Sequence, residues 1–231
     1  MRQSRAPVKR LWIAIKYAVR QKKAQGFRYY IKIRKFIPLK SEIMIYNERD
    51  IRNQTVKRLA EAVMAAARTA PKAKGRDLVE VAMITDEDIE RLSQTMLQMS
   101  AESGMKFLLR DAANVLEAEA VIVVGIQCEQ SECGLNCGYC GYKGCTEKPA
   151  CTPCVMNGVD VGIAIGAACS KIADFRLDSR VMFSAGWAAK RLDVLNGADL
   201  VFAIPLSSSS KNPFFDRKSP RKEQPAEQPK Q

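Results

Sequence analysis

The sequence of 231 residues contains no histidine. This absence excludes Ser–His–Asp and Cys–His catalysis, zinc held by histidine, Rieske centres and haem bound through histidine. Long apolar runs are also missing. The longest, around residues 118–126, has the length of a strand and falls short of the ~18 residues that a membrane span needs. We therefore expect no transmembrane segment, and a secretory signal fits poorly, so we expect a cytoplasmic protein.

Acidic residues are almost absent from residues 1–43, which hold 13 Lys or Arg and one acid, Glu42. The rest of the chain holds 24 residues of each sign, so the net charge of +12 belongs to this basic N-terminal arm. Three interpretations stay open: an amphipathic surface helix, a nucleic-acid arm, or an over-extended start with Met44 as the natural first residue. We expect no nucleic-acid binding by the body, because it carries no excess positive charge.

From residue 44 onward, helices alternate with short strands. We expect helices over about 47–69 (with Asn47 as N-cap), 85–100 (with a capping-box-like pair, Thr85 and Asp88), 105–116, 157–173 and 188–195. Strands are expected over 78–84, 120–126, 180–183 and 200–204, the second of them buried and central. This alternation predicts an α/β or α+β domain of three layers over residues 44–217, with a cysteine-rich loop inserted at 128–154. Residues 218–231 are polar and proline-rich, which predicts a disordered tail.

Seven of the eight cysteines fall within the loop 128–154, and the eighth, Cys169, is expected to be a buried core thiol. A disulfide framework is the weaker interpretation without a secretory signal, and metal ligation is the stronger one. Two kinds of site fit the spacing. A zinc site would use Cys137, Cys140, Cys151 and Cys154. An iron–sulfur cluster would use Cys137, Cys140, Cys145 and one later cysteine.

Glycines favour the cluster over zinc. Gly138, Gly141 and Gly144 each stand beside one of the three closely spaced cysteines. Glycine lets backbone N–H groups approach sulfur closely, which the sulfides and thiolates of a cluster require. The loop therefore predicts a 4Fe–4S site.

Residues 136–145, Asn-Cys-Gly-x-Cys-Gly-x-x-Gly-Cys, resemble the first three ligands of the 4Fe–4S domain in Rnf-type electron-transport subunits and corrinoid iron–sulfur proteins. In those proteins the fourth cysteine usually lies further downstream than Cys154 does here. The candidates for the fourth ligand are therefore ranked Cys154 first, Cys151 second and Cys169 third.

A wider resemblance covers about residues 44–217. The segments 66–75, 109–112, 159–166, 204–207 and 211–217 resemble a bacterial and archaeal family of uncharacterised proteins that contain a ferredoxin domain. That family carries a cysteine at the position of Cys154. The resemblance thus implies that Cys137, Cys140, Cys145 and Cys154 hold a 4Fe–4S cluster, with Cys128, Cys133 and Cys151 as extras. It also implies an electron-transfer protein with a redox partner protein, and a homo-oligomer is compatible with it.

A fainter resemblance to flavin-dependent nitroreductases rests on Arg-x-Ala-Pro at 68–71, followed by a strand, and on a late Asp-x-x-x-Ala helix. It implies a nitroreductase-like fold and, as an alternative function, an FMN-dependent oxidoreductase. The basic phosphate-binding motif of those enzymes is missing, and the basic candidates are scattered: Arg68, Lys72, Arg180 and Lys211. We therefore expect FMN to bind weakly or not at all. The remaining alternative is a non-enzymatic binding module in which zinc only staples the loop.

Overall fold

The computed structural model describes residues 45–127, 133–150 and 152–215. The predicted basic arm, the predicted tail, Cys128 and Cys151 lie outside these residues. The chain divides between Tyr46 and Asn47, and the fold below is that of the described residues from Asn47 onward.

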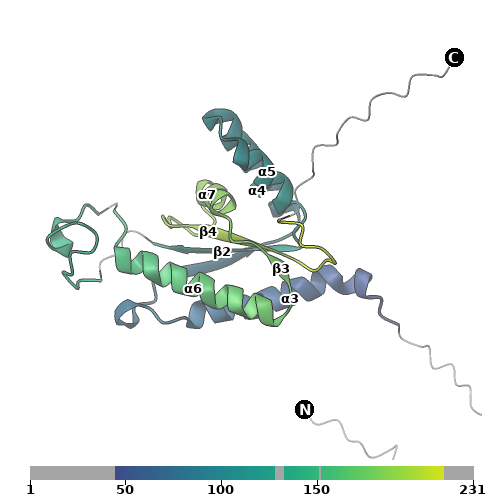
Figure 1. Ribbon diagram of the computed structural model, residues 1–231, viewed down its shortest axis with the longest axis horizontal. Helices are drawn as coiled ribbons and strands as arrows, with labels where there is room; N and C mark the ends of the chain where they lie inside the picture. Colours follow the sequence, from purple (N-terminus) through teal and green to yellow (C-terminus); the bar gives the residue numbers. More distant parts are fainter. Residues whose placement is uncertain (1–44, 128–132, 151, 216–231) are drawn as a thin grey trace, which may run out of the picture. The chain divides into compact units, whose positions relative to one another are not determined.

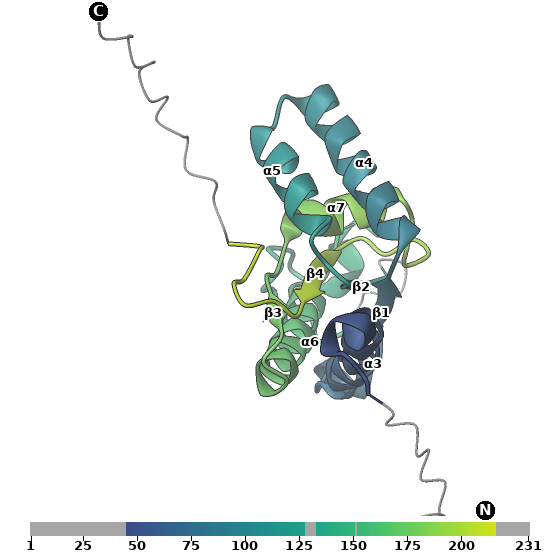
Figure 2. The same ribbon diagram turned by 90° about the vertical axis from the view of Figure 1, so that its right-hand side faces the viewer.

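A four-stranded antiparallel sheet forms the middle of three layers (Figures 1 and 2). The strand order across the sheet is β1 (Val79–Ile84), β2 (Ala120–Ile126), β4 (Phe202–Ser207) and β3 (Asp178–Ser179). Helices α3 (Glu48–Thr69) and α6 (Val155–Asp174) pack on one face of the sheet. The other face is covered by α4 (Glu87–Ser103), α5 (Lys106–Val115) and α7 (Phe183–Arg191). The predicted three-layer domain is confirmed, and its antiparallel pairing makes it α+β.

Local sequence explains the first helix and the central strand. The Asn47 side chain accepts a hydrogen bond from the Arg49 N–H at 3.0 Å and so caps α3, as predicted. The buried residues of α3 recur every three or four positions and form one face against the sheet: Val56, Ala60, Val63 and Ala67. Every residue of β2 is buried, because helices cover both of its faces. The predicted buried central strand is confirmed.

The last strand and helix differ from their predictions. The strand expected at 180–183 is β3 at Asp178–Ser179, and the helix expected from residue 188 already begins at Phe183. Met182 forms a single antiparallel β-bridge with Ala203 of β4, and the chain then enters α7, which packs on the sheet. Gly186 permits this path, because a Cβ at this position would overlap the backbone of Val201 and Phe202. The close crossing of α7 over β4 is a tertiary feature that helix and strand patterns do not encode.

The predicted capping box at the start of α4 is also wrong. The N-cap is Asp86, with φ 54°, and its side chain makes no capping hydrogen bond. The Asp86 carboxylate instead accepts a hydrogen bond from the Lys57 ammonium of α3 at 2.6 Å. A contact between elements that lie far apart in sequence has replaced the local one.

The cysteine loop leaves the sheet where β2 ends and rejoins the domain at the start of α6 (Figure 1). The loop is therefore anchored to the rigid sheet at one end and to the first turn of a long helix at the other.

The short 3-10 helix η1 (Ala73–Gly75) is also bound to α6, by a hydrogen bond from the Ala73 N–H to the Asp160 carboxylate at 3.0 Å.

By length and composition alone, α6 is apolar enough to cross a membrane, a test that the core helices of soluble proteins also pass. Its buried residues pack against the sheet beside α3, and they include the hydrogen-bonded Asp160. The expectation that the chain has no transmembrane segment stays a prediction.

Candidate metal centre

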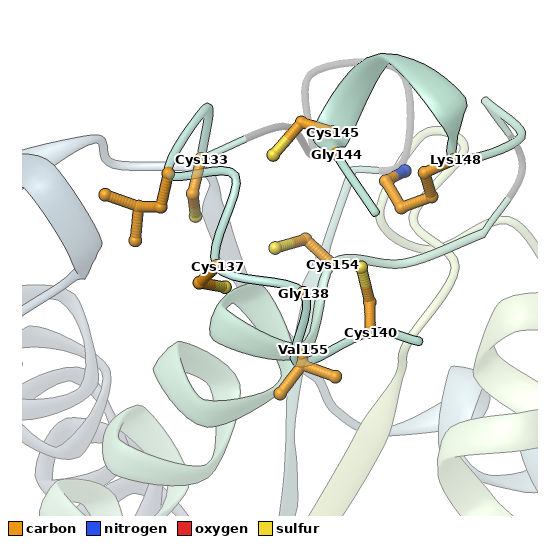
Figure 3. Close-up of a pocket in the computed structure, with 10 residues that line it drawn as sticks. Cys133, Cys137, Gly138, Cys140, Gly144, Cys145, Lys148, Cys154 and Val155 are labelled. Atoms are coloured by element: carbon orange, nitrogen blue, oxygen red, sulfur yellow. The ribbon is translucent and has the colours of Figure 1, made fainter. Parts of the chain in front are cut away.

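Five cysteine side chains line one pocket at the N-terminal end of α6 (Figure 3): Cys133, Cys137, Cys140, Cys145 and Cys154. The remaining lining residues are Leu135, Gly138, Gly144, Lys148 and Val155, so no carboxylate is among the described residues that form the wall. The structure thus brings the four predicted ligands together. It also brings in Cys133, which the sequence treated as an extra. Cys169 lies elsewhere, beside the apolar cluster between α3, α6 and the sheet.

The sulfur atoms surround the pocket and do not meet at one point. Within the described ranges, no three Cys, Asp or Glu side chains are grouped closely enough to hold a single metal ion. A zinc site needs its cysteine sulfurs ~2.3 Å from one central ion. In a 4Fe–4S cluster each thiolate binds a different iron, so the ligands enclose a cage. Cys151, which the zinc site would use, lies outside the described residues, so both predicted sites stay predictions.

A glycine turn separates the first two predicted ligands. Gly138 has φ 73° and Gly141 has φ 88°, and the Gly141 N–H donates to the Gly138 carbonyl at 2.9 Å. Side chains with a Cβ are strained at such angles. The glycines after Cys137 and Cys140 are therefore required by the turn, in addition to any close approach to sulfur.

Asn136 contacts Cys145 through two hydrogen bonds, one at its side chain and one at its backbone N–H, which together form the Asn136 clamp. Its side-chain oxygen accepts a hydrogen bond from the Cys145 N–H at 2.9 Å, and its own N–H points at the Cys145 sulfur at 3.3 Å. Asn136 also has φ 48°, a left-handed conformation that asparagine tolerates better than most residues. This asparagine stands in the cysteine–glycine motif at 136–145, but the sequence alone indicated no role for it. The sequence feature that could have revealed its role is an asparagine directly before the first predicted ligand, Cys137.

Cys154 is the N-cap residue of α6. Burial alone would raise its pKa, but hydrogen bonds from the backbone N–H groups of Met156, Asn157 and Cys133 outweigh it and lower the pKa of Cys154. The free N–H groups and the dipole at a helix N-terminus favour a thiolate in this way. The helix start therefore favours the thiolate form of Cys154.

Cys133 is the neighbour of Cys154, and its environment has the opposite effect. Only 3% of this residue is exposed, and its thiol donates to the Asn157 side-chain oxygen at 3.1 Å. Burial, followed by the charge of Cys154, raises the pKa of Cys133 to about 11. Of this pair, Cys154 is the better thiolate ligand and Cys133 the better hydrogen-bond donor. Cys133 reaches the pocket through the path of the loop, for which the sequence offered no signal beyond the density of cysteines.

Lys148 is the one charged residue in the described wall of the pocket. It is buried, and its ammonium donates hydrogen bonds to the carbonyl oxygens of Thr152 at 2.5 Å and Pro149 at 3.4 Å. The sequence carries no signal for this burial, because one lysine in a loop is usually solvent-exposed.

Comparison with known proteins identifies the family. Residues 150–217 match the family described as uncharacterized protein containing a ferredoxin domain (DUF2148). A protein of Archaeoglobus fulgidus, described as an uncharacterized protein, is 37% identical over 188 residues, which is 78% of this chain and 100% of that protein. The chain belongs to this family, as the resemblance in its sequence implied, and a ferredoxin domain points to iron–sulfur electron transfer.

Solved structures similar to this one include nitroreductases, the enzymes that the sequence faintly resembles. A nitroreductase of Bacteroides fragilis with bound FMN is 13% identical, with a TM-score of 0.49 over 70% of this chain and 82% of that one. The nitroreductase CinD of Lactococcus lactis, in complex with nicotinic acid, is 15% identical, with a TM-score of 0.48 over 73% of this chain and 82% of that one. Likeness at this level does not carry the ligands of these enzymes over to this chain.

Proposed function

We propose that this protein binds one 4Fe–4S cluster in the five-cysteine pocket and passes single electrons to a redox partner protein. The ligands in this proposal are Cys137, Cys140, Cys145 and Cys154. The observation that carries it is the convergence of these side chains on a pocket whose described wall has no carboxylate. Membership of a family described as containing a ferredoxin domain supports it.

When bound, the cluster supplies one-electron acceptance and release. The chain holds its thiolates in place through the Asn136 clamp on Cys145 and the N-terminal turn of α6 at Cys154. Cys137 is exposed, and Cys140 and Cys145 are half-buried, so a partner can come close to this edge of the pocket. Thiols stay reduced in the cytoplasm, which is the location that this proposal requires.

The direct test is the metal content of protein purified without air. We expect iron and acid-labile sulfide in equal amounts, at about four of each per chain, with a broad visible absorption that bleaches on reduction. Stoichiometric zinc without labile sulfide would instead support the zinc-stapled module and overturn the proposal.

Single Cys→Ala variants test the ligand set. Replacing Cys137, Cys140, Cys145 or Cys154 is expected to remove most of the iron and sulfide, because a site with three cysteines leaves one iron open. Cys169→Ala is the matched control, since this thiol lies outside the pocket, and it should keep a full cluster. Cys133→Ala should also keep the cluster. Loss in Cys133→Ala, together with retention in Cys154→Ala, would reassign the fourth ligand without disturbing the function.

An FMN-dependent oxidoreductase stays the alternative, and the described residues offer little support for a phosphate site. Arg68 lies 3.0 Å from the Asp77 carboxylate, Lys72 lies 3.3 Å from the same group, and Arg180 lies 3.3 Å from the Asp111 carboxylate. These candidate cations therefore already have acidic partners within the chain. Tight stoichiometric quenching of FMN fluorescence by the anaerobic protein would favour the alternative.

A further inference from the structure

The surroundings of Lys148 differ from those of the other shielded lysine in the described part of the chain. Lys148 is 6% exposed, and among the described residues no carboxylate lies within ion-pair distance of its ammonium. The side chain of Lys72 is also 6% exposed, but its ammonium lies 3.3 Å from the Asp77 carboxylate. Among the described residues, one shielded lysine thus has an acidic partner, and the other lines a pocket of thiols.

Burying a charge without an opposite charge is costly. The Lys148 ammonium has three N–H donors, and two of them have carbonyl acceptors among the described residues, Pro149 and Thr152. Carbonyl groups satisfy hydrogen bonds but do not neutralise a charge. Lys148 lines the same pocket as Cys140, Cys145 and Cys154, and Figure 3 draws its side chain beside theirs. Among the described residues of this wall, thiolate sulfur is the only group that could carry a negative charge.

We propose that Lys148 is the built-in counter-ion of the cluster and raises its reduction potential. This inference rests on the proposed function. A 4Fe–4S core held by four thiolates has a net negative charge in both oxidation states. On reduction, one electron from an external donor enters the cluster, no bond forms or breaks, and the lysine keeps its proton. The attraction between ammonium and cluster is stronger after the electron arrives, so the charge of Lys148 stabilises the reduced state.

The test compares midpoint potentials of the full chain, purified without air and titrated with dithionite in the presence of mediators. Lys148→Met removes the charge but keeps most of the side chain, and Lys148→Arg keeps the charge. Lys143→Met is the matched control, because Lys143 lies in the same loop but is exposed and outside the wall of the pocket. We expect Lys148→Met to lower the equilibrium constant for one-electron reduction of the cluster about tenfold, which shifts the midpoint potential by ~59 mV toward negative values. Lys148→Arg and Lys143→Met should stay near the wild-type value.

A wild-type potential in a fully loaded Lys148→Met protein would overturn the inference. An equal shift in Lys143→Met would also overturn it, because the effect would then belong to the charge of the whole loop. If Lys148→Met assembles no cluster, Lys148→Gln is measured, since its amide can still donate to the Thr152 carbonyl, and an unshifted potential there again overturns the inference. If both uncharged variants fail to load while Lys148→Arg loads and all apo-proteins melt alike, the charge is needed to hold the cluster, which supports the counter-ion role. Failure of the proposed function shows separately, as wild-type protein without iron and labile sulfide.

Discussion

The three-layer body and the cysteine loop are held together by different forces. Two apolar clusters, one on each face of the sheet, stabilise the body, and neither includes a described residue between Cys133 and Cys154. The described loop has one 3-10 turn, η3 (Cys145–Glu147), and a few single hydrogen bonds such as those of Asn136 and Lys148. Apolar packing is cooperative, whereas a few isolated polar contacts are not.

This contrast assigns different consequences to the two regions. Changes in the body are expected to alter folding, whereas changes in the loop are expected to alter metal binding and leave folding nearly unchanged. The four predictions that follow test this separation, in order of decreasing effect.

The largest effect is expected at Gly186, where α7 crosses β4. An added Cβ would lie 2.8 Å from the Phe202 nitrogen and closer still to the Phe202 Cα and the Val201 carbonyl oxygen. Backbone cannot yield as a side chain can, so Gly186→Ala should destabilise the domain by ~3 kcal/mol or more, or prevent folding. Gly162→Ala is the control, because an added Cβ in α6 meets open space and alanine favours helix by about 0.5–1 kcal/mol. Urea denaturation followed by circular dichroism measures both. Equal stability of the two variants would refute the prediction.

The second effect concerns Asp111, a buried carboxylate that connects α5 to α7 and, through Arg180, to the segment that follows β4. It accepts hydrogen bonds from Ser184 at 2.6 Å and Arg110 at 2.8 Å, and Arg180 links it to the Phe214 carbonyl. Burial raises its pKa, but the hydrogen bonds from Arg110 and Ser184 and the charge of Arg180 outweigh burial, so the pKa of Asp111 lies below its ordinary value. Asp111→Asn should cost about 1–3 kcal/mol of unfolding free energy at pH 7.

The sign of the pH dependence follows from that lowered pKa. The ionised Asp111 contributes its stability above the pKa of the unfolded chain, about 3.9, and loses it as the pH falls through the lower folded-state value. The stability advantage of wild type over Asp111→Asn should therefore be constant near neutral pH and shrink below about pH 4. Denaturation curves at several pH values measure it. An advantage that is equally large at the lowest pH would show that the carboxylate charge is not the cause.

The third effect concerns the loop alone. Asn136→Ala removes the hydrogen bond to the Cys145 N–H and places alanine at φ 48°, a conformation that costs it roughly 1 kcal/mol. We expect the cluster to bleach several times faster when a chelator is added, with little change in the melting temperature of the body. Asn136→Gly separates the two causes, because glycine tolerates the backbone angle but lacks the hydrogen bond, and it should give an intermediate rate. If the cluster bleaches at the wild-type rate in both variants, the Asn136 clamp does not help to hold it.

The smallest effect on the body is expected when the metal is removed. Chelation under reducing conditions should leave the circular dichroism and the melting temperature of the three-layer domain almost unchanged, because the apolar clusters are independent of the loop. The loop should then become the preferred site of limited proteolysis, within residues 128–154. Cooperative unfolding of the whole domain on chelation would show that the cluster is part of the core and would abolish the distinction between the two regions.

Patterns in the sequence predicted the elements that depend on local chemistry. The Asn47 cap and the continuously apolar β2 act over a few residues, and they occur in the structure as expected. The Thr85–Asp88 capping box was equally local, yet Asp86 pairs with Lys57 of another helix. Local prediction failed where a partner from a distant element was available.

The sequence by itself predicted a cysteine-based metal site, because it has no histidine and because cysteines and glycines are closely spaced at 136–145. Only the tertiary structure decided which side chains share the pocket. It placed Cys133 and a buried Lys148 in the wall and put Cys154 at the start of a helix that favours its thiolate. The physical reason is that a ligand motif reports spacing along the chain, whereas burial, the end of a helix and the meeting of two loop segments arise only when the chain folds back on itself.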